Sequence, residues 1–537
     1  MLISLYMLYA ISFLFFAYKR IMVLMHFFQQ EEYHNKRFIL YILKNSNLID
    51  KKLSVCLAIC MLITLISNNL ILHLSLLSAI LVSFAIFQYN PIKNAKKALV
   101  ITSRVKRLFE VIMLILTIIL AFIFFNKNEE PCFLYMLSIL LVQAMPLIII
   151  ITNILLFPAE KIIQFKYLTQ AKAKLTRYNP TVIAITGSYG KTSTKHILAH
   201  ILGSVAPTLA TPGSINTPMG ITRIIREQLL PEHKFFIVEM GAYGKGSIAR
   251  LCNLTPPNFG IITSIGNAHF ERFKSIENVA KAKFELAQAV MKNKQGLMFI
   301  NANAVAEIFI NKYCSTSPIM VTNKTKNIPE TFNITNTSQT VDGIKFQIQH
   351  DNSSYNVNSN LYGLHHVENI ALCFALAHKL GISAETITAS LRITPQIRHR
   401  LEVIKEKSKP VIIDDAYNSN PTGFTAALGV LQTFKEQGYR SIIVTPGMVE
   451  LGKLHNDKHF EIGEKTSKIA DYVLVITPKR IPSFIDGFNS KANNKQKLIT
   501  FDTFEQAKQW LDQNTTYKDI VLFENDLPDL YDSKVNL

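Results

Sequence analysis

The residues best suited to chemistry lie in the segment Gly187–Thr192, which reads Gly-Ser-Tyr-Gly-Lys-Thr. The two glycines allow a turn tight enough for successive backbone N–H groups to face one anion. The lysine adds a point charge for terminal phosphates, and the threonine hydroxyl suits a Mg²⁺ ligand. A full Walker A motif has a further glycine at the position of Ile185, so this motif is a shortened form. It predicts binding of a nucleoside triphosphate with Mg²⁺.

Two elements must position this motif. The apolar run Thr181–Thr186 predicts a short β-strand before it, and the segment up to Leu202 predicts a helix after it. A chance glycine turn between a strand and a helix is the alternative interpretation. The agreement of strand, glycines, Lys-Thr pair and helix favours a phosphate-binding loop.

Two further side chains could bind a metal beside this loop. Glu239 ends the buried-type strand Lys234–Glu239, and an acid at the carboxyl end of a neighbouring strand can bind Mg²⁺. For this residue taken alone, a solvated carboxylate at a strand end is an equal alternative. His269 follows the strand Phe259–Ile265 and is a candidate ligand, although a lone histidine is more often structural.

Alternating strands and helices after the apolar N-terminal third predict the α/β class. We expect a P-loop central domain over residues 180–395, with a mainly parallel sheet and its ligands at the carboxyl ends of the strands. Residues 396–537 are expected to form a smaller, Rossmann-like C-terminal domain. That domain lacks a Gly-x-Gly-x-x-Gly fingerprint, so we do not expect a dinucleotide site.

Residues 1–160 are strongly apolar and predict a transmembrane region of about five helices. The apolar runs are Leu2–Ala17, Leu53–Ile66, Leu70–Phe87, Leu108–Phe125 and Cys132–Phe157. The last three are long enough for a hydrocarbon core of about 30 Å, and the first two must tilt or extend. Few charges interrupt the runs, which argues against buried helices of a soluble domain. Basic segments around them place the N-terminus outside and everything after Phe157 in the cytoplasm. A basic linker helix is expected over residues 161–179.

The net charge of +19 is explained by Lys and Arg flanking the apolar runs and by general lysine richness. The sequence contains no motif of a known nucleic-acid reader, so we expect no nucleic-acid partner. Its six cysteines form no Cys-x-x-Cys pair. We therefore expect a reducing compartment and no structural zinc.

Several ordered motifs resemble those of the Mur ligases. The resemblance is strongest to the MurF branch, which adds D-alanyl-D-alanine to UDP-N-acetylmuramoyl-tripeptide. The motifs are Thr186–Thr194, Val238–Gly241, Ala268–Glu271, Ala280–Glu285, Gly363–Asn369, Arg400, Asp414–Pro421 and Pro446–Gly452. The resemblance implies an ATP-dependent amide ligase of peptidoglycan biosynthesis, acting through an acyl phosphate. It also implies a bacterial inner membrane as the location of the apolar region, and a role in cell wall biogenesis, cell shape and cell division.

The resemblance further implies a role for each matching residue. Lys191, Lys283 and His269 would be catalytic, and Lys283 stands where these ligases carry a carbamylated lysine. Two Mg²⁺ ions would be held by Thr192, Glu239, His269 and Lys283. ATP would be bound by Gly187, Ser188, Tyr189, Gly190, Lys191, Thr192, Ser193, His365, Asn369, Arg400 and Asp415. Substrate would lie near Asn216, Thr217, Asn418 and His455.

The carbamate is physically coherent, because an ordinary ammonium beside Mg²⁺ would be repelled whereas a carbamate offers an anionic oxygen ligand. The alternative for Lys283 is a solvated charge on a helix surface. Lys281, two residues earlier, illustrates how common lysine is in this chain.

The sequence departs from the family pattern at four places. Asn216-Thr217 replaces the usual Asn-Asn, and His366 replaces a usual Asn. The segment Phe523–Asp529 replaces a Lys-Gly-Ser-Arg-like stretch, which bears on recognition of the acceptor. Residues 1–180 contain apolar runs in place of a soluble UDP-binding domain.

Three interpretations of function follow. The favoured one is ligation of D-alanyl-D-alanine to a UDP-muramyl peptide. A second is a ligase of the same type acting on a lipid-linked or other polymer carboxylate. The third is a membrane scaffold without activity, which the complete set of Lys191, Thr192, Glu239, His269 and Lys283 disfavours, because a scaffold needs no metal site.

Overall fold

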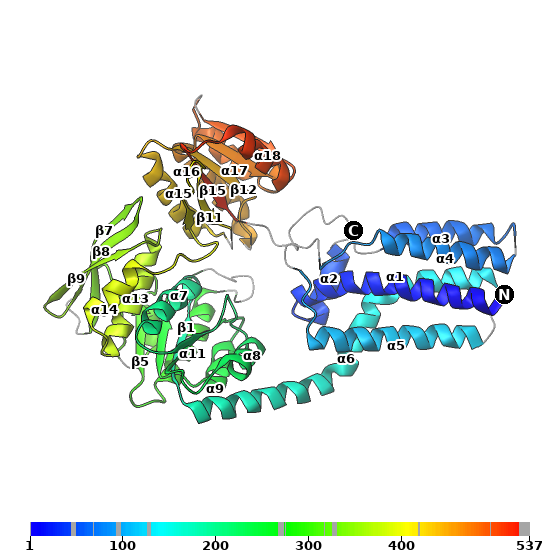
Figure 1. The fold of residues 1–537 in the computed structure, drawn as a ribbon, viewed down its shortest axis with the longest axis horizontal. Helices are drawn as coiled ribbons and strands as arrows, with labels where there is room; N and C mark the ends of the chain where they lie inside the picture. Colours follow the sequence, from blue (N-terminus) through cyan, green and yellow to red (C-terminus); the bar gives the residue numbers. More distant parts are fainter. Residues whose placement is uncertain are drawn as a thin grey trace. The chain divides into compact units, whose positions relative to one another are not determined.

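The chain folds into two compact units, an N-terminal unit that ends at Gln164 and a second unit that begins at Phe165 (Figure 1). The computed structural model describes residues 2–44, 50–67, 69–92, 98–125, 130–266, 273, 275–315, 317–324, 330–416, 419–449, 451–493 and 496–525.

The N-terminal unit is helical. Its helices are α1 (Leu2–Gln30), α2 (Asn35–Lys44), α3 (Lys51–Ile63), α4 (Leu70–Ile86), α5 (Ser103–Phe125) and the first part of α6 (Pro131–Tyr178). Each of the five apolar runs therefore lies mostly within a helix, and α2 is a further helix between the first two runs. Among the described residues, α1, α5 and α6 are long and apolar enough to cross a membrane, whereas α4 is a shorter apolar helix. That this unit crosses the membrane five times remains a prediction.

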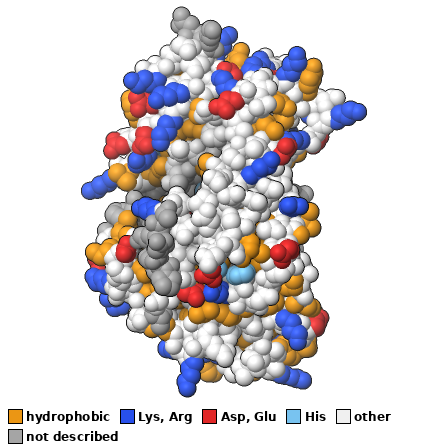
Figure 2. All heavy atoms as spheres, turned by 90° about the vertical axis from the view of Figure 1, so that its left-hand side faces the viewer, with side chains coloured by type: hydrophobic (Ala, Val, Ile, Leu, Met, Phe, Trp, Pro, Cys, Tyr) orange, Lys and Arg blue, Asp and Glu red, His pale blue; other side chains and the backbone are white. Residues whose placement is uncertain are grey.

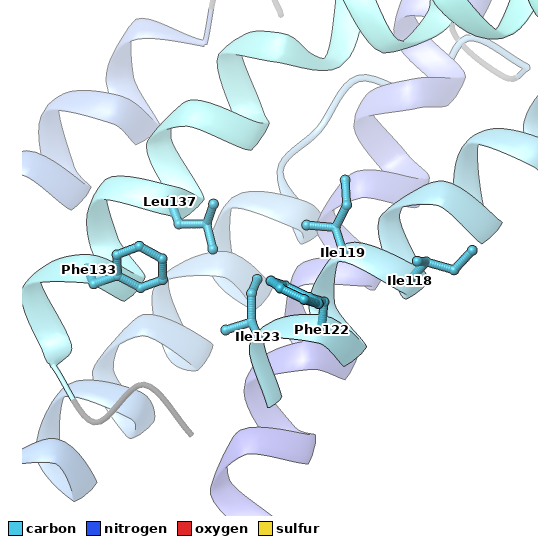
Figure 3. A pocket seen from close by; sticks show the side chains of 6 residues that line it. All are labelled: Ile118, Ile119, Phe122, Ile123, Phe133 and Leu137. Carbon is cyan, nitrogen blue, oxygen red and sulfur yellow. The ribbon is translucent and has the colours of Figure 1, made fainter. Parts of the chain in front are cut away.

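Apolar side chains cover both the inside and the outside of this unit. Phe13, Phe16 and Phe28 are fully buried, while Phe122 on α5 and Leu140 on α6 are well exposed. A cavity of about 380 Å³ between α5 and α6 is lined only by apolar side chains (Figure 3). An apolar exterior of this extent is typical of a surface that meets lipid or another protein.

Helix α6 is one continuous helix of 48 residues with Pro146 and Pro158 inside it. The segment expected as a linker helix over 161–179 is helical up to Tyr178 and forms the last part of α6, because Pro158 does not end the helix. The C-terminal turns of α6 belong to the second unit. There Ala171 and Leu175 are buried in its core, and Lys174 Nζ donates to the carbonyl of Arg226 at 2.8 Å.

The second unit contains two sheets, and the first has the strand order β2-β3-β1-β4-β5-β6-β7-β8-β9. Its strands are β1 (Thr181–Thr186), β2 (Thr208–Ala210), β3 (Phe235–Glu239), β4 (Phe259–Ile262), β5 (Leu297–Asn301), β6 (Ile319–Thr322), β7 (Thr331–Thr340), β8 (Gly343–His350) and β9 (Ser353–Ser359). The pairs up to β6–β7 are parallel, and β7–β8 and β8–β9 are antiparallel. The prediction of a mainly parallel sheet is confirmed for β1–β7, whereas the antiparallel strands β8 and β9 were not predicted.

Helices cover both faces of this sheet. They are α7 (Lys191–Gly203), α8 (Pro218–Gln228), α9 (Ser247–Leu254), α11 (Ile276–Val290), α12 (Glu307–Tyr313), α13 (His365–Lys379) and α14 (Ala384–Arg392). One apolar core joins the sheet to α7, α13 and α14, and another joins it to α8, α9, α11 and α12. Strand β1 is buried on both faces, which explains its unbroken apolar sequence.

The second sheet has the order β10-β11-β15-β12-β13-β14 and is parallel except for the edge strand β10. Its strands are β10 (Glu402–Ile404), β11 (Val411–Asp415), β12 (Arg440–Thr445), β13 (Tyr472–Ile476), β14 (Lys497–Phe501) and β15 (Asp519–Glu524). Its helices are α15 (Pro421–Lys435), η2 (Gly452–Leu454), α16 (His455–Ile469), η3 (Pro478–Arg480), α17 (Pro482–Lys491) and α18 (Phe504–Asn514). Cores on both faces make this a three-layer Rossmann-like arrangement, which confirms the predicted α/β class.

The basic excess is not concentrated on the face drawn in Figure 2. Lysine and arginine side chains are interspersed there with aspartate and glutamate. Such mixing differs from the basic stripe typical of a nucleic-acid surface.

Candidate active site

The segment between β1 and α7 forms a tight loop that only glycine permits at two positions. Gly190 has a φ of 82° and ends the loop as the N-cap of α7. A Cβ there would lie 2.7 Å from Asn369 Oδ1, and a Cβ on Gly187 would lie 1.9 Å from Thr263 Oγ1. Both positions therefore require glycine, because neighbouring side chains approach too closely for a Cβ atom. At Gly190 the positive φ requires glycine as well.

The residues after β4 hold this loop in place. The backbone N–H of Tyr189 donates to Ser264 Oγ at 2.8 Å, and that of Ser188 donates to the Ser264 carbonyl at 2.9 Å. Ser188 Oγ in turn accepts from the backbone N–H of Gly266 at 2.9 Å. Ser264 was not identified from the sequence, because a serine after a strand carries no signal of its own. It fixes the loop that presents Lys191.

Lys191 lies across its own loop, with Nζ donating to the carbonyls of Gly187 at 2.8 Å and Ser188 at 3.3 Å. Burial lowers the pKa of Lys191, the carboxylate of Glu239 raises it, and the charges of Arg400 and Lys195 lower it further. Three cationic side chains thus act on one another here. Such a gathering is stabilised by an anion of several charges.

Glu239 is the buried acid of the site, with 1% of its surface exposed. The β1–β3 register pairs it with Ile185, which brings it beside the loop. Its Oε2 accepts from Thr192 Oγ1 at 2.9 Å and from Lys195 Nζ at 3.0 Å, and its Oε1 accepts from Asn216 Nδ2 at 3.2 Å. The alternative of a solvated strand-end carboxylate does not fit these contacts.

Thr192 and Glu239 suit Mg²⁺ as oxygen ligands. Adjacent ligands of an octahedral Mg²⁺ at about 2.1 Å lie about 3.0 Å apart, close to the 2.9 Å between Thr192 Oγ1 and Glu239 Oε2. Lys195, which was not predicted from the sequence, also neutralises this carboxylate. Its only signal was its position one helical turn after Lys191.

Lys283 on α11 has 4% of its surface exposed, so the alternative of a solvated helix charge is wrong. Among the described parts of the chain it makes no hydrogen bond and no ion pair. Burial, with a further contribution from the charge of Lys191, lowers the pKa of Lys283 well below its ordinary value. A buried lysine in this state favours the neutral, nucleophilic amine.

Asn369 on α13 reaches the start of α7, where its Oδ1 accepts from Thr194 Oγ1 at 3.2 Å. Ser193, the preceding residue on α7, is buried. His365, the first residue of α13, is exposed, whereas His366 is buried. Burial and the neighbouring cationic groups lower the pKa of His366, so this histidine is neutral at physiological pH.

Two predicted residues adjoin strands of the second sheet, with Arg400 two residues before β10 and Asp415 at the end of β11. Arg400 acts electrostatically on both Lys191 and Asp415, which links the two sheets at this site. Asp415 ends β11, and Oδ1 accepts from the backbone N–H of Leu401 at 3.1 Å. Burial raises the pKa of Asp415 to about 7. Its partner in the strand register is Glu524. Burial and the charge of Asp415 raise the pKa of Glu524 well above its ordinary value.

The other predicted substrate residues differ in their surroundings. Asn216 contacts Glu239 and also accepts from the Tyr243 hydroxyl at 3.1 Å. Thr217 is the N-cap of α8, so its hydroxyl is used within the chain. His455 begins α16 and contacts the Arg480 carbonyl through Nε2 at 3.1 Å. His269 and Asn418 lie outside the described residues.

One further group of metal-ligating side chains occurs among the described residues, formed by His399, Glu402 and Asp414. His399 Nδ1 and Asp414 Oδ2 are 2.7 Å apart. Glu402 Oε2 accepts from the backbone N–H of His399 at 3.2 Å. The group is internally satisfied as hydrogen bonds and needs no metal to explain it.

Comparison with known families gives two adjoining matches. The family described as Mur ligase middle domain matches residues 185–377, and the Mur ligase, glutamate ligase domain matches residues 399–524. These ranges contain the loop, the acid and the strand ends described above.

Curated relatives match the same part of the chain. It is 32% identical over 327 residues to the UDP-N-acetylmuramoyl-tripeptide–D-alanyl-D-alanine ligase of Escherichia coli (strain K12), covering 59% of this chain and 70% of that protein. It is 31% identical over 322 residues to the ligase of the same name from Mycobacterium tuberculosis (strain ATCC 25618 / H37Rv), covering 58% and 61%. The chain thus spans about three fifths of the mycobacterial relative and somewhat more of the other.

Solved structures share the fold. A UDP-N-acetylmuramoylalanyl-D-glutamyl-2,6-diaminopimelate–D-alanyl-D-alanyl ligase from Acinetobacter baumannii matches with a TM-score of 0.59 and 25% identity, over 68% of this chain and 76% of that one. MurF ligase from Thermotoga maritima, solved in complex with ADP, matches with a TM-score of 0.58 and 23% identity, over 68% and 81%.

Proposed function

The chain belongs to the Mur ligase family, and on that premise we propose that it joins D-alanyl-D-alanine to UDP-N-acetylmuramoyl-tripeptide, using ATP. The product would be a precursor of peptidoglycan. The names of the curated relatives, at about 30% identity, support this choice of substrates.

The observation that carries the proposal is the contact set at the carboxyl ends of β1 and β3. Lys191 lies in the glycine loop, and Thr192 and Lys195 both contact the buried carboxylate of Glu239. A loop for phosphate, an oxygen pair for Mg²⁺ and a cluster of cations therefore meet at one place. This combination fits phosphoryl transfer and has no evident use in a scaffold.

The reaction has two steps. A carboxylate oxygen of the acceptor attacks the γ-phosphorus of ATP, and the bond to ADP breaks to give an acyl phosphate. The amino group of D-alanyl-D-alanine then attacks the acyl carbon, loses a proton and expels inorganic phosphate. Lys191 and Arg400 would bind and orient the phosphoryl oxygens as their charge shifts in the first step.

Two Mg²⁺ ions, held by Thr192 and Glu239 and by His269 and Lys283, would supply Lewis-acid charge at the phosphoryl oxygens. The second set requires Lys283 as its carbamate. Burial without a described partner supports this assignment, because the neutral amine is the form that adds carbon dioxide. The carbamate would then place an anionic oxygen where an ammonium would be repelled.

The N-terminal unit would cross the bacterial inner membrane several times, with the second unit in the cytoplasm where ATP is available. Support comes from the three long apolar helices and from the apolar exterior of the unit. Because the apolar N-terminal unit precedes the ligase domains in the chain, a lipid-linked carboxylate is the second candidate acceptor.

The test is phosphate release by the purified full chain with Mg²⁺-ATP. UDP-muramyl tripeptide, UDP-muramyl dipeptide and a lipid-linked tripeptide would be compared, each with and without D-alanyl-D-alanine. With UDP-muramyl tripeptide, we expect phosphate release that depends on D-alanyl-D-alanine. Lys191→Ala should lower this release at least about 10²-fold. Release only with the lipid-linked peptide would reject the soluble acceptor, and release unaffected by Lys191→Ala would reject the site.

A further inference from the structure

We propose that Tyr243 is a positioning residue for the magnesium site, acting through Asn216 on the carboxylate of Glu239. The proposal deepens the proposed function, and it rests on the assignment of Thr192 and Glu239 as Mg²⁺ ligands. The Tyr243 hydroxyl lies one side chain away from the carboxylate that would bind the metal.

The carboxylate of Glu239 has a hydrogen-bond partner on each of its two oxygens. Oε2 accepts from Thr192 Oγ1 at 2.9 Å and from Lys195 Nζ at 3.0 Å. Oε1 accepts from Asn216 Nδ2 at 3.2 Å. Because Oε2 is the oxygen beside the threonine hydroxyl, it is the one placed to bind Mg²⁺ together with Thr192. The contact to Oε1 therefore fixes how the carboxylate is turned toward the metal.

The amide of Asn216 has one favourable orientation here. An ionised carboxylate only accepts hydrogen bonds, so the amide NH₂ group must face Glu239. The amide oxygen then faces the Tyr243 hydroxyl, which donates to it at 3.1 Å. The phenol therefore stabilises the orientation in which Asn216 donates to the metal-binding carboxylate.

The backbone of Gly241 packs directly against this amide. A Cβ on Gly241 would lie 2.8 Å from both Cγ and Oδ1 of Asn216. The backbone N–H of Gly241 also donates to the Asn216 carbonyl at 3.2 Å. The segment that follows β3 thus holds Asn216 by its backbone and by its side chain.

The loop that carries Tyr243 is fixed where it enters α9. Glu285 on α11 accepts there from the backbone N–H groups of Gly246 at 2.6 Å and Ala249 at 3.0 Å. The backbone N–H of Tyr243 also donates to Ser247 Oγ at 3.3 Å. Since the loop backbone is already held, placing the hydroxyl of Tyr243 costs little further conformational entropy.

Tyr243 is also a residue that can be changed without unfolding the chain, because 36% of its surface is exposed. Tyr243→Phe keeps the ring and removes only the hydroxyl. An effect of this variant on the metal site can therefore be separated from loss of the fold.

The test measures how much Mg²⁺ strengthens nucleotide binding. Isothermal titration calorimetry of the full chain in detergent gives the Kd of a non-hydrolysable ATP analogue, once in EDTA and once with Mg²⁺ in excess of the nucleotide. For Tyr243→Phe we expect the parent Kd in EDTA. In Mg²⁺ we expect binding weaker by about three- to tenfold, the effect of one neutral hydrogen bond.

Two comparisons accompany this variant. Tyr313→Phe is the matched control, because the Tyr313 hydroxyl also donates to a side chain, Glu277 Oε1 at 2.8 Å, which is not part of the Glu239 network. It should bind the nucleotide as the parent chain does. In an Asn216→Ala background, Tyr243→Phe should have no further effect on the Kd in Mg²⁺, because the amide on which it acts is gone.

Three results would overturn the proposal. The first is a parent-like Kd of Tyr243→Phe in Mg²⁺, and the second is equal weakening in EDTA and in Mg²⁺, which would mean a general structural role. The third is a full additional effect of Tyr243→Phe in the Asn216→Ala background. None of these three touches the proposed ligase reaction. If Mg²⁺ does not strengthen nucleotide binding by the parent chain, the assigned metal site itself is wrong and the proposal falls with it.

Discussion

Lys281 and Lys283 lie two residues apart on α11, yet the first is exposed and the second is buried. Lys283→Ala should lower ligation at least about 10²-fold, because it removes the carbamate that would ligate Mg²⁺. Short carboxylates added to the assay should restore part of the activity. Lys281→Ala is the matched control and should ligate at the parent rate. Full activity of the Lys283 variant without added carboxylate would rule out the carbamate.

Lys195 forms the buried ion pair with Glu239, and its role there is partly structural. Lys195→Met should lower the free energy of unfolding by about 3–5 kcal/mol, because it leaves a buried carboxylate without its cation. Denaturant titration of the full chain in detergent measures this loss.

The exposed pair Arg223–Glu227 on α8 supplies the control for Lys195. Arg223→Met should change the free energy of unfolding by no more than about 0.5 kcal/mol. Equal effects of the two substitutions would mean that the Lys195–Glu239 pair does not stabilise the fold.

The sequence was informative at the residue scale where a motif has a fixed spacing. Gly187, Gly190, Lys191 and Thr192 could be predicted because each is needed at a set position around a phosphate. Lys195 could not, since one more lysine on a helix of a lysine-rich chain carries no signal until the fold buries it. Ser264 could not be predicted either, because only the pairing of β1 with β4 brings it to the loop.

At the scale of elements, β11 and β15 bring two carboxyl groups together in register, Asp415 and Glu524. Burial raises the pKa of Asp415 to about 7, and the charge of Asp414 also raises it. The hydrogen bond from the Leu401 N–H and the charge of Arg400 lower the pKa in part. The folded pKa therefore lies above the unfolded value of about 4, so the folded state binds more protons between these pH values. The contribution of this carboxyl pair to the free energy of unfolding should fall as pH rises from about 4 to about 7.

Glu524→Gln should weaken this pH dependence, because a neutral amide removes the second acid and can donate to Asp415. The measurement is denaturant unfolding of parent and variant at several pH values. An identical pH profile for the two proteins would show that the carboxyl pair does not control stability in this range.

Elements were predictable where their pattern is unambiguous. Strands β1, β3, β12 and β13 are buried on both faces and read as unbroken apolar runs. The antiparallel strand β8, with an alternating burial pattern, and the polar strands around it gave no such run. Helix α6 continues through Pro158, so the last apolar run and the expected linker helix belong to one element.

The proposed membrane topology, with five spans and the ligase domains in the cytoplasm, concerns the whole molecule. Reporter fusions after Asn90 and after Leu175 should report the cytoplasm, and a fusion at Lys127 should report the outside, because basic segments stay inside. Reporters active on opposite sides of the membrane provide the measurement. An external signal at Leu175 would separate the ligase domains from ATP and overturn the five-span arrangement.

In the proposed reaction an acceptor carboxylate attacks ATP and is then joined to D-alanyl-D-alanine. The most direct measurement uses UDP-N-acetylmuramoyl-tripeptide with both oxygens of its reacting carboxylate labelled with ¹⁸O, the full chain, Mg²⁺-ATP and D-alanyl-D-alanine. Mass spectrometry of the released phosphate then reports where one carboxylate oxygen has gone. We expect one ¹⁸O atom in each phosphate and one retained in the new amide. Amide product with unlabelled phosphate, or no product from these substrates, would contradict it.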